Sequence, residues 1–161
     1  IGHAHAPNAC ATVGHMQVRP NSRNVIPGEV FLTIDYRHPV DETLSAMDAE
    51  LKAFCENLAE VDQVSVDVVD FWYFPPTPFN TECVDAVRNG AEMAGYTHRD
   101  IISGAGHDAI YLAGVAPTGM VFIPCEDGIS HNEIENATPE DCAAGCQVLL
   151  HAALERAEPI S

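Results

Sequence analysis

Basic residues are scarce in this sequence, which has 7 Lys and Arg against 24 Asp and Glu and a formal net charge of -17. A negative field of this size repels the phosphates of nucleic acids and the surfaces of anionic membranes. The sequence also lacks an apolar run of about 18 residues, the length that indicates a membrane-spanning helix. We therefore expect no nucleic-acid partner and no membrane partner.

Cysteine pairs of the kind that indicate a disulfide framework or a zinc site are lacking as well. The cysteines form no CxxC motif and no regular framework. We interpret them as reduced core residues of a cytoplasmic protein, in preference to disulfides or a metal site. The six are Cys10, Cys55, Cys83, Cys125, Cys142 and Cys146.

No signal peptide is recognisable, because the chain starts Ile-Gly-His-Ala-His-Ala-Pro without a methionine or a basic segment. We interpret this start as the interior of a longer chain. What is present is typical of a folded globular protein, with 161 residues of which 47% are hydrophobic and 19% charged. A chain of this length buries about 70% of its unfolded surface.

The first half of the sequence predicts an antiparallel sheet with a helix on one face. Residues 11–18 and 30–36 predict a hairpin, and residues 64–74 predict a third strand that the prolines of residues 75–78 end. Residues 41–59, with an aspartate as N-cap, predict an amphipathic helix. Its apolar stripe consists of Leu44, Met47, Leu51, Phe54, Leu58 and Val61.

The second half predicts helices that alternate with strands. Helices are expected over residues 80–95, 109–113 and 138–157, the last with a Thr-Pro start. Residues 101–103 and 120–123 predict short strands, the latter buried on both faces of a mostly parallel sheet. The fold class is thus a mixture of α/β and α+β. The expected inner face of the last helix consists of Cys142, Cys146, Leu149, Leu150, Ala153 and Leu154.

Two histidines, His107 and His131, lie in glycine-containing loops on either side of the predicted strand 120–123. Loops at strand ends are where open α/β sheets bind ligands, and imidazole is the commonest metal ligand near neutral pH. Judged by the residues alone, ordinary turn histidines are the alternative. In the same way, Asp108 is explained by a helix cap and Arg37 by a surface charge.

Three longer motifs carry a family resemblance: RPNSRNVIPGEVFLTIDYRHP at residues 19–39, SGAGHDA at residues 103–109 and FIPCEDGISHNEIE at residues 122–135. With these motifs the sequence resembles the zinc-dependent N-carbamoyl-L-amino-acid amidohydrolases. That group includes β-ureidopropionases and allantoate amidohydrolases, within the aminoacylase/carboxypeptidase superfamily. The likeness runs from about residue 11 to 157 and matches only the C-terminal part of such an enzyme.

The resemblance implies two domains. Residues 1–76 would be a partial lid or dimerisation domain, and residues 77–161 the C-terminal part of an α/β metallohydrolase catalytic domain. In the first, Asn24 and Arg37 are expected to bind the carboxylate of the substrate. The chemistry suits this role, because a guanidinium presents a fork of donors that matches a carboxylate.

In the second domain the resemblance implies a metal ligand and substrate contacts. His131 is expected to bind metal, and Gly106 and His107 to contact the substrate, with His107 also as a catalytic residue. Glu135 and Asp108 are expected to hold these groups in position without contacting the substrate or the metal.

The implied reaction is hydrolysis of the carbamoyl C–N bond of N-carbamoyl amino acids or ureido acids, with a pair of divalent metals. Zinc is the first expectation, and manganese, cobalt and nickel are alternatives. The other metal-binding motifs of the family are not in this sequence, and even one catalytic zinc normally has three protein ligands. We therefore expect an incomplete ligand set and an inactive isolated chain.

The expected partners are a small N-carbamoyl or ureido acid, a second copy that pairs through the lid domain, and a missing N-terminal half. Two other functions compete: a non-catalytic dimerisation module with an exposed strand edge, and an aminoacylase or dipeptidase of the same superfamily. The missing half has three explanations, namely proteolysis, a deliberately expressed fragment and loss of the catalytic half of a gene.

Overall fold

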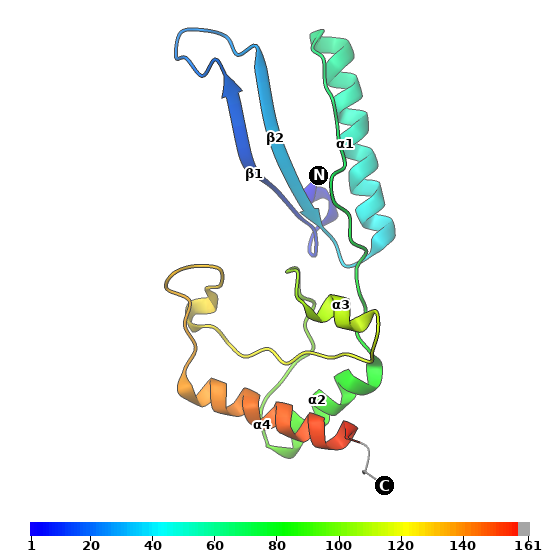
Figure 1. Ribbon diagram of the computed structural model, residues 1–161, viewed down its shortest axis with the longest axis vertical. Helices are drawn as coiled ribbons and strands as arrows, with labels where there is room; N and C mark the ends of the chain where they lie inside the picture. Colours follow the sequence, from blue (N-terminus) through cyan, green and yellow to red (C-terminus); the bar gives the residue numbers. More distant parts are fainter. Residues whose placement is uncertain (158–161) are drawn as a thin grey trace. The chain divides into compact units, whose positions relative to one another are not determined.

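The chain divides by its contacts into two units, Ile1–Pro76 and Thr77–Ser161. The computed structural model describes residues 1–157 (Figure 1). Those residues contain a two-stranded antiparallel sheet and four α-helices, so the predicted mixed α/β class is confirmed. The role of each unit, as part of a lid or of a catalytic domain, stays a prediction.

A β-hairpin forms one layer of the first unit. Strands β1 (Cys10–Arg19) and β2 (Glu29–Arg37) are antiparallel, with Cys10 opposite Arg37. A register shift gives β1 one extra residue near Gly14, which is a β-bulge. Both predicted strands are confirmed, each longer by one residue at either end.

Helix α1 (Asp41–Asp62) forms the second layer of this unit (Figure 1). Leu44 and Met47 of the predicted apolar stripe are buried, as expected. Phe54 and Val61 are 59% and 70% exposed, so their predicted place in the core is wrong. The reason is the size of the sheet, because the two strands of the described residues cannot cover a helix of 22 residues.

Residues 64–74 are not a strand, contrary to the prediction. An extended segment becomes a strand only when a neighbour pairs with it, and the sheet of the described residues has two strands. Side chains join the segment to α1 instead: Lys52 Nζ donates to Asp70 at 2.6 Å, and the Tyr73 hydroxyl donates to Asp41 at 2.5 Å. Asp41, the predicted N-cap, is the first residue of α1 and makes no cap bond.

A carboxylate between β2 and α1 makes the stability of the first unit depend on pH. Lys52 Nζ donates to Asp48 at 2.8 Å and the Tyr36 hydroxyl donates to it at 2.5 Å. These bonds, that of Lys52 first, lower the pKa of Asp48 from its ordinary value of 3.8. The stability contributed by Asp48 is thus present above pH 3.8 and is lost as the pH falls through the lower folded pKa.

We expect Asp48→Asn to unfold at lower urea concentration than the wild-type chain at neutral pH, and to match it in strong acid. The measurement is urea unfolding at a series of pH values, followed by circular dichroism. Glu56→Gln, at an exposed position of the same helix, is the control and should follow the wild type throughout. An offset between Asp48→Asn and wild type that does not change with pH would contradict the role of the carboxylate charge.

Two helices form the core of the second unit. Side chains cap both helices: Asn80, one of two cap candidates with Thr81, accepts a hydrogen bond from Cys83 N at 3.1 Å, and Thr138 accepts one from Asp141 N at 3.0 Å. Small residues allow the helices to approach closely, since Ala86, Gly90, Ala91, Val148 and Ala152 are the buried residues of the pair. The elements of this unit are α2 (Thr81–Met93), α3 (Ala109–Ala113), the 3-10 turn η2 (Glu126–Gly128) and α4 (Pro139–Arg156).

Gly90 is the tightest point between α2 and α4. A Cβ at this position would lie 2.9 Å from the carbonyl oxygen of Val148, which belongs to the backbone. Alanine normally stabilises a helix by about 1 kcal/mol relative to glycine. We expect Gly90→Ala to lose that gain and to destabilise the chain by about 1–3 kcal/mol, because backbone cannot move aside as a side chain can.

Urea unfolding of Gly90→Ala measures this loss, with Met93→Ala as the control at an exposed position of the same helix. The control should unfold close to the wild type, because methionine and alanine have similar helix propensities. Stabilisation of Gly90→Ala would show that α2 and α4 do not approach as closely as the structure indicates.

The predicted inner face of α4 is wrong. Leu149, Leu150 and Leu154 are 58%, 57% and 65% exposed, and Cys142, Cys146 and Ala153 are exposed too. The helix turns its smaller residues toward α2, because only these permit the close approach at Gly90. Even with this leucine face, no helix within residues 1–157 is long and apolar enough to cross a membrane.

Two further expectations for the second unit are wrong. Residues 101–103 and 120–123 are extended but form no strand, and Phe122 is 43% exposed. Strands of a parallel sheet need neighbours from distant parts of a chain, and the described residues supply none here. The six cysteines are free, but none of them is buried, so they are not core residues.

Candidate functional site

Arg37 is the last residue of β2, and its guanidinium forms an ion pair with the carboxylate of Asp35. Its Nε donates to Asp35 Oδ1 at 2.8 Å and its Nη2 to Asp35 Oδ2 at 2.6 Å. Residues i and i+2 of a strand lie on the same face, which explains the pair. The pair raises the pKa of Arg37 and lowers that of Asp35. Both side chains are about half exposed.

Asn24 lies in the loop between β1 and β2, at the opposite end of the hairpin from Arg37. Its side-chain oxygen accepts a hydrogen bond from the Ser22 hydroxyl at 2.7 Å. The length of β2 separates the two ends by roughly 25 Å at about 3.3 Å per residue. Asn24 and Arg37 of one copy therefore do not meet at one carboxylate.

His107 lies in the glycine-containing loop before α3 and is held by two contacts. Its Nε2 is 2.6 Å from Ser103 Oγ, and its ring meets the Phe122 ring edge-on with centroids 5.5 Å apart. The backbone N–H of Ala105 donates to the same Ser103 oxygen at 3.2 Å. A Cβ at Gly106 would meet nothing within 4 Å, so the backbone there stands open to a ligand.

Asp108, expected to support the site, occupies the N-cap position of α3 but makes no side-chain cap bond. Its backbone carbonyl accepts hydrogen bonds from Tyr111 N at 3.1 Å and Leu112 N at 3.4 Å. Asp108 thus lies at the cap position, as the helix-cap alternative expects, but its side chain does not cap the helix. A supporting role for the Asp108 carboxylate stays a prediction.

His131 stands in a strained backbone conformation that a carboxylate stabilises. Its φ is +57°, in the left-handed region that few non-glycine residues adopt. Glu135 Oε2 accepts a hydrogen bond from the His131 backbone N–H at 2.7 Å, and Ser130 Oγ lies 3.1 Å from His131 Nδ1. Glu135 thus holds the loop that carries His131, although through the backbone rather than the ring.

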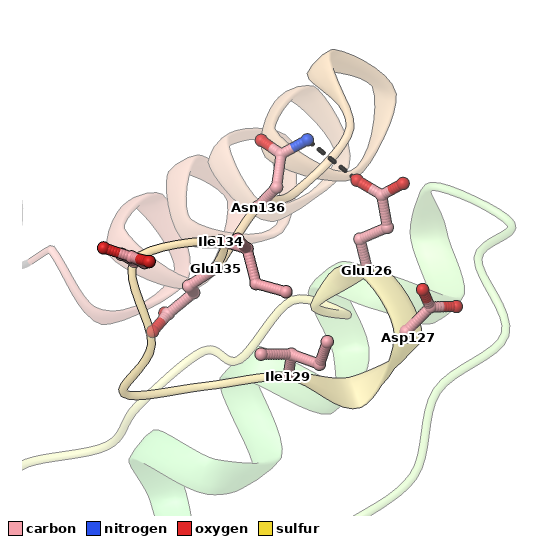
Figure 2. Close-up of a pocket in the computed structure, with 7 residues that line it drawn as sticks. Glu126, Asp127, Ile129, Ile134, Glu135 and Asn136 are labelled. Atoms are coloured by element: carbon pink, nitrogen blue, oxygen red, sulfur yellow. Dashed lines mark hydrogen bonds between the residues drawn. The ribbon is translucent and has the colours of Figure 1, made fainter.

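The base of this loop is closed by a second pair of hydrogen bonds. Glu126 N donates to Asn136 O at 2.7 Å, and Asn136 Nδ2 donates to the Glu126 carboxylate at 2.9 Å (Figure 2). The loop between these residues surrounds an open hollow beside Ile129 and Ile134 (Figure 2). Together with the Glu135 bond, these hydrogen bonds fix the loop that carries His131.

The residues present do not fit a complete metal centre. Within residues 1–157, no three His, Cys, Asp or Glu side chains lie together in a way that could hold a metal ion. His131 is a single candidate ligand, and a catalytic zinc normally has three from the protein.

Comparisons with known proteins identify the family of this chain. The chain belongs to Peptidase family M20/M25/M40, whose pattern matches residues 3–155. The chain is 45% identical over 152 residues to the N-carbamoyl-L-amino-acid amidohydrolase of Rhizobium meliloti, which is 94% of this chain and 36% of that protein. It is 36% identical over 143 residues to the allantoate amidohydrolase of Escherichia coli, covering 86% of this chain and 34% of that protein.

The crystal structure of an amidase of the hydantoinase/carbamoylase family from Burkholderia vietnamiensis is also similar. It matches with a TM-score of 0.91 and 58% identity over 99% of this chain and 39% of that one. The predicted family resemblance is thereby confirmed. The chain spans little more than a third of the length of these relatives.

The resemblance named the candidate residues but missed two of their partners. Ser103, four residues before His107, and Asp35, two residues before Arg37, each bond the side chain in question. A spacing of two along a strand is a readable signal for the second pair. The first pair depends on a loop conformation that the residue pattern does not determine.

Proposed function

We propose that this chain is part of a metal-dependent hydrolase that cleaves the carbamoyl C–N bond of N-carbamoyl-L-amino acids or related ureido acids. The observation that carries the proposal is similarity over nearly the whole chain to the Rhizobium meliloti amidohydrolase and to the Burkholderia vietnamiensis amidase. Metal dependence is a general property of the family. Zinc is the metal that we propose, with manganese, cobalt or nickel as alternatives.

The side chains of this chain would bind and orient the substrate. The Arg37 fork would bind its carboxylate, and His107 with the Gly106 backbone would contact the ureido group. His131 would be one ligand of the metal pair, which when bound polarises the carbonyl that is attacked. Glu135 would keep His131 in position.

A homodimer is part of this proposal, because the two carboxylate-binding residues lie at opposite ends of one hairpin. If both bind one carboxylate, Asn24 of one copy must meet Arg37 of another. Pairing through the first unit would bring them together. The free cysteines support our placement of the protein in the cytoplasm.

A chimera tests the proposal directly. This chain would replace the matching region of the Rhizobium meliloti amidohydrolase, whose remaining part would supply the other metal ligands. We expect the chimera with added zinc to release ammonia from N-carbamoyl-L-amino acids, and the isolated 161-residue chain to release none. A folded, metal-loaded chimera that cleaves N-acyl amino acids or dipeptides but no ureido acid would favour the aminoacylase or dipeptidase alternative. Activity of the isolated chain would refute the proposal that the other metal ligands lie outside it.

A further inference from the structure

The hydrogen bond between Ser103 and His107 joins two polar side chains of one loop. The two atoms, Ser103 Oγ and His107 Nε2, are 2.6 Å apart. At this distance the two atoms share a hydrogen bond, which either the serine hydroxyl or an Nε2–H could donate.

A third group, the backbone N–H of Ala105, favours donation by the serine hydroxyl. Ala105 N–H donates to Ser103 Oγ at 3.2 Å, so the oxygen already accepts one hydrogen bond. A hydroxyl has one proton to donate and two lone pairs to accept. If the serine hydroxyl donates to His107, its one proton has a partner within the loop. If the serine oxygen instead accepts from an Nε2–H, the hydroxyl proton has no partner within the loop.

We propose that Ser103 is a positioning residue, which fixes the neutral His107 ring with Nε2 as acceptor and the proton on Nδ1. Phe122 restrains the plane of the ring through its edge-on contact. The Nδ1–H makes no hydrogen bond to protein within residues 1–157. It is therefore the group that can donate to an oxygen of a ligand, here the carbonyl or carboxylate of the ureido acid; this last step rests on the proposed function.

The choice of proton position matters because the two nitrogens of imidazole have opposite roles. A neutral ring that accepts at Nε2 is a donor at Nδ1, and the reverse tautomer would present a lone pair to the same ligand oxygen. A lone pair facing a ligand oxygen repels it. The serine thereby selects the form of His107 that binds an acceptor.

The experiment is long-range proton–nitrogen NMR of the 161-residue chain, which reports the protonation of each ring nitrogen. We expect the wild-type His107 ring to be the Nδ1–H tautomer, and Ser103→Ala to shift it to a mixture with the Nε2–H form. Ser103→Thr keeps a hydroxyl and should restore the wild-type signals. Ser130→Ala removes a serine beside another histidine, His131, and should leave the His107 signals unchanged.

A wild-type ring protonated at Nε2, or a Ser103→Ala ring that stays in the Nδ1–H form, would overturn the proposal. The second readout is kcat/KM of the chimera, for which we expect about a tenfold loss in Ser103→Ala, as for other residues that orient a functional group. The NMR result does not depend on turnover. An inactive chimera with the predicted tautomer would therefore refute the proposed function and leave the role of Ser103 intact.

Discussion

Replacement of His131 by asparagine in the chimera is expected to lower kcat/KM for N-carbamoyl amino acids by about 100-fold or more. Loss of a group that only supports a metal ligand typically costs 10- to 100-fold in affinity or activity, so loss of a ligand costs at least as much. Asparagine is preferred to alanine because it tolerates the left-handed backbone that His131 adopts, at φ +57°. The loop should therefore keep its shape while the imidazole is lost.

Metal content by mass spectrometry, together with kcat/KM, measures the effect. We expect less than the full metal complement in the His131→Asn chimera, with partial recovery of activity at high zinc concentration. His98→Asn is the matched control. His98 is an exposed histidine of the same unit, and its Nδ1 lies 3.4 Å from the backbone oxygen of Tyr96. Unchanged metal content and activity in His131→Asn would remove His131 from the metal site.

The predicted and observed folds agree where an element depends on contacts between residues close in sequence, and differ where it depends on distant ones. Helix starts at Asn80 and Thr138 are predictable, because a cap is a contact over two or three residues. The strands expected over residues 64–74, 101–103 and 120–123 depend on neighbours elsewhere in a sheet, and in the described residues only the hairpin finds one. Extended, apolar composition is therefore necessary for a strand but does not supply its partner.

The same argument explains the reversed face of α4. Its leucines form the more apolar stripe, and burial of apolar area predicts them inside. In the described unit α2 offers a surface of small residues, which admits Val148 and Ala152 and leaves Leu149, Leu150 and Leu154 exposed. A residue pattern indicates that a face is apolar, and the neighbouring element decides whether it is covered.

The candidate site was predictable to a similar extent. The motifs indicated candidate residues, but not how they are held or which of them meet. The Ser103–His107 bond and the Glu135 bond to the His131 backbone come from loop conformation. The separation of Asn24 from Arg37, in contrast, follows from a hairpin register that the strand prediction already contained.

Arg37→Ala is expected to raise the KM of the chimera for N-carbamoyl amino acids by roughly 10- to 100-fold. Hydrogen bonds to charged groups contribute about 1.5–3 kcal/mol, and each 1.4 kcal/mol is a factor of ten. Arg37→Lys should restore only part of the affinity, since an ammonium lacks the planar fork. Arg19→Ala is the control, because Arg19 also ends a strand and pairs with a carboxylate, Glu29, at 3.6 Å. Its KM should equal that of the parent chimera.

The arrangement of the two carboxylate-binding residues can be tested by mixing copies. Asn24→Ala and Arg37→Ala chimeras are each expected to be weak, because every site of either homodimer lacks one of the two groups. If the groups come from different copies, each mixed dimer contains one intact site. Random exchange of subunits should then recover about a quarter of the parental activity at low substrate concentration. No recovery after exchange, with mixed dimers verified by mass spectrometry, would show that Asn24 and Arg37 of different copies do not serve one carboxylate.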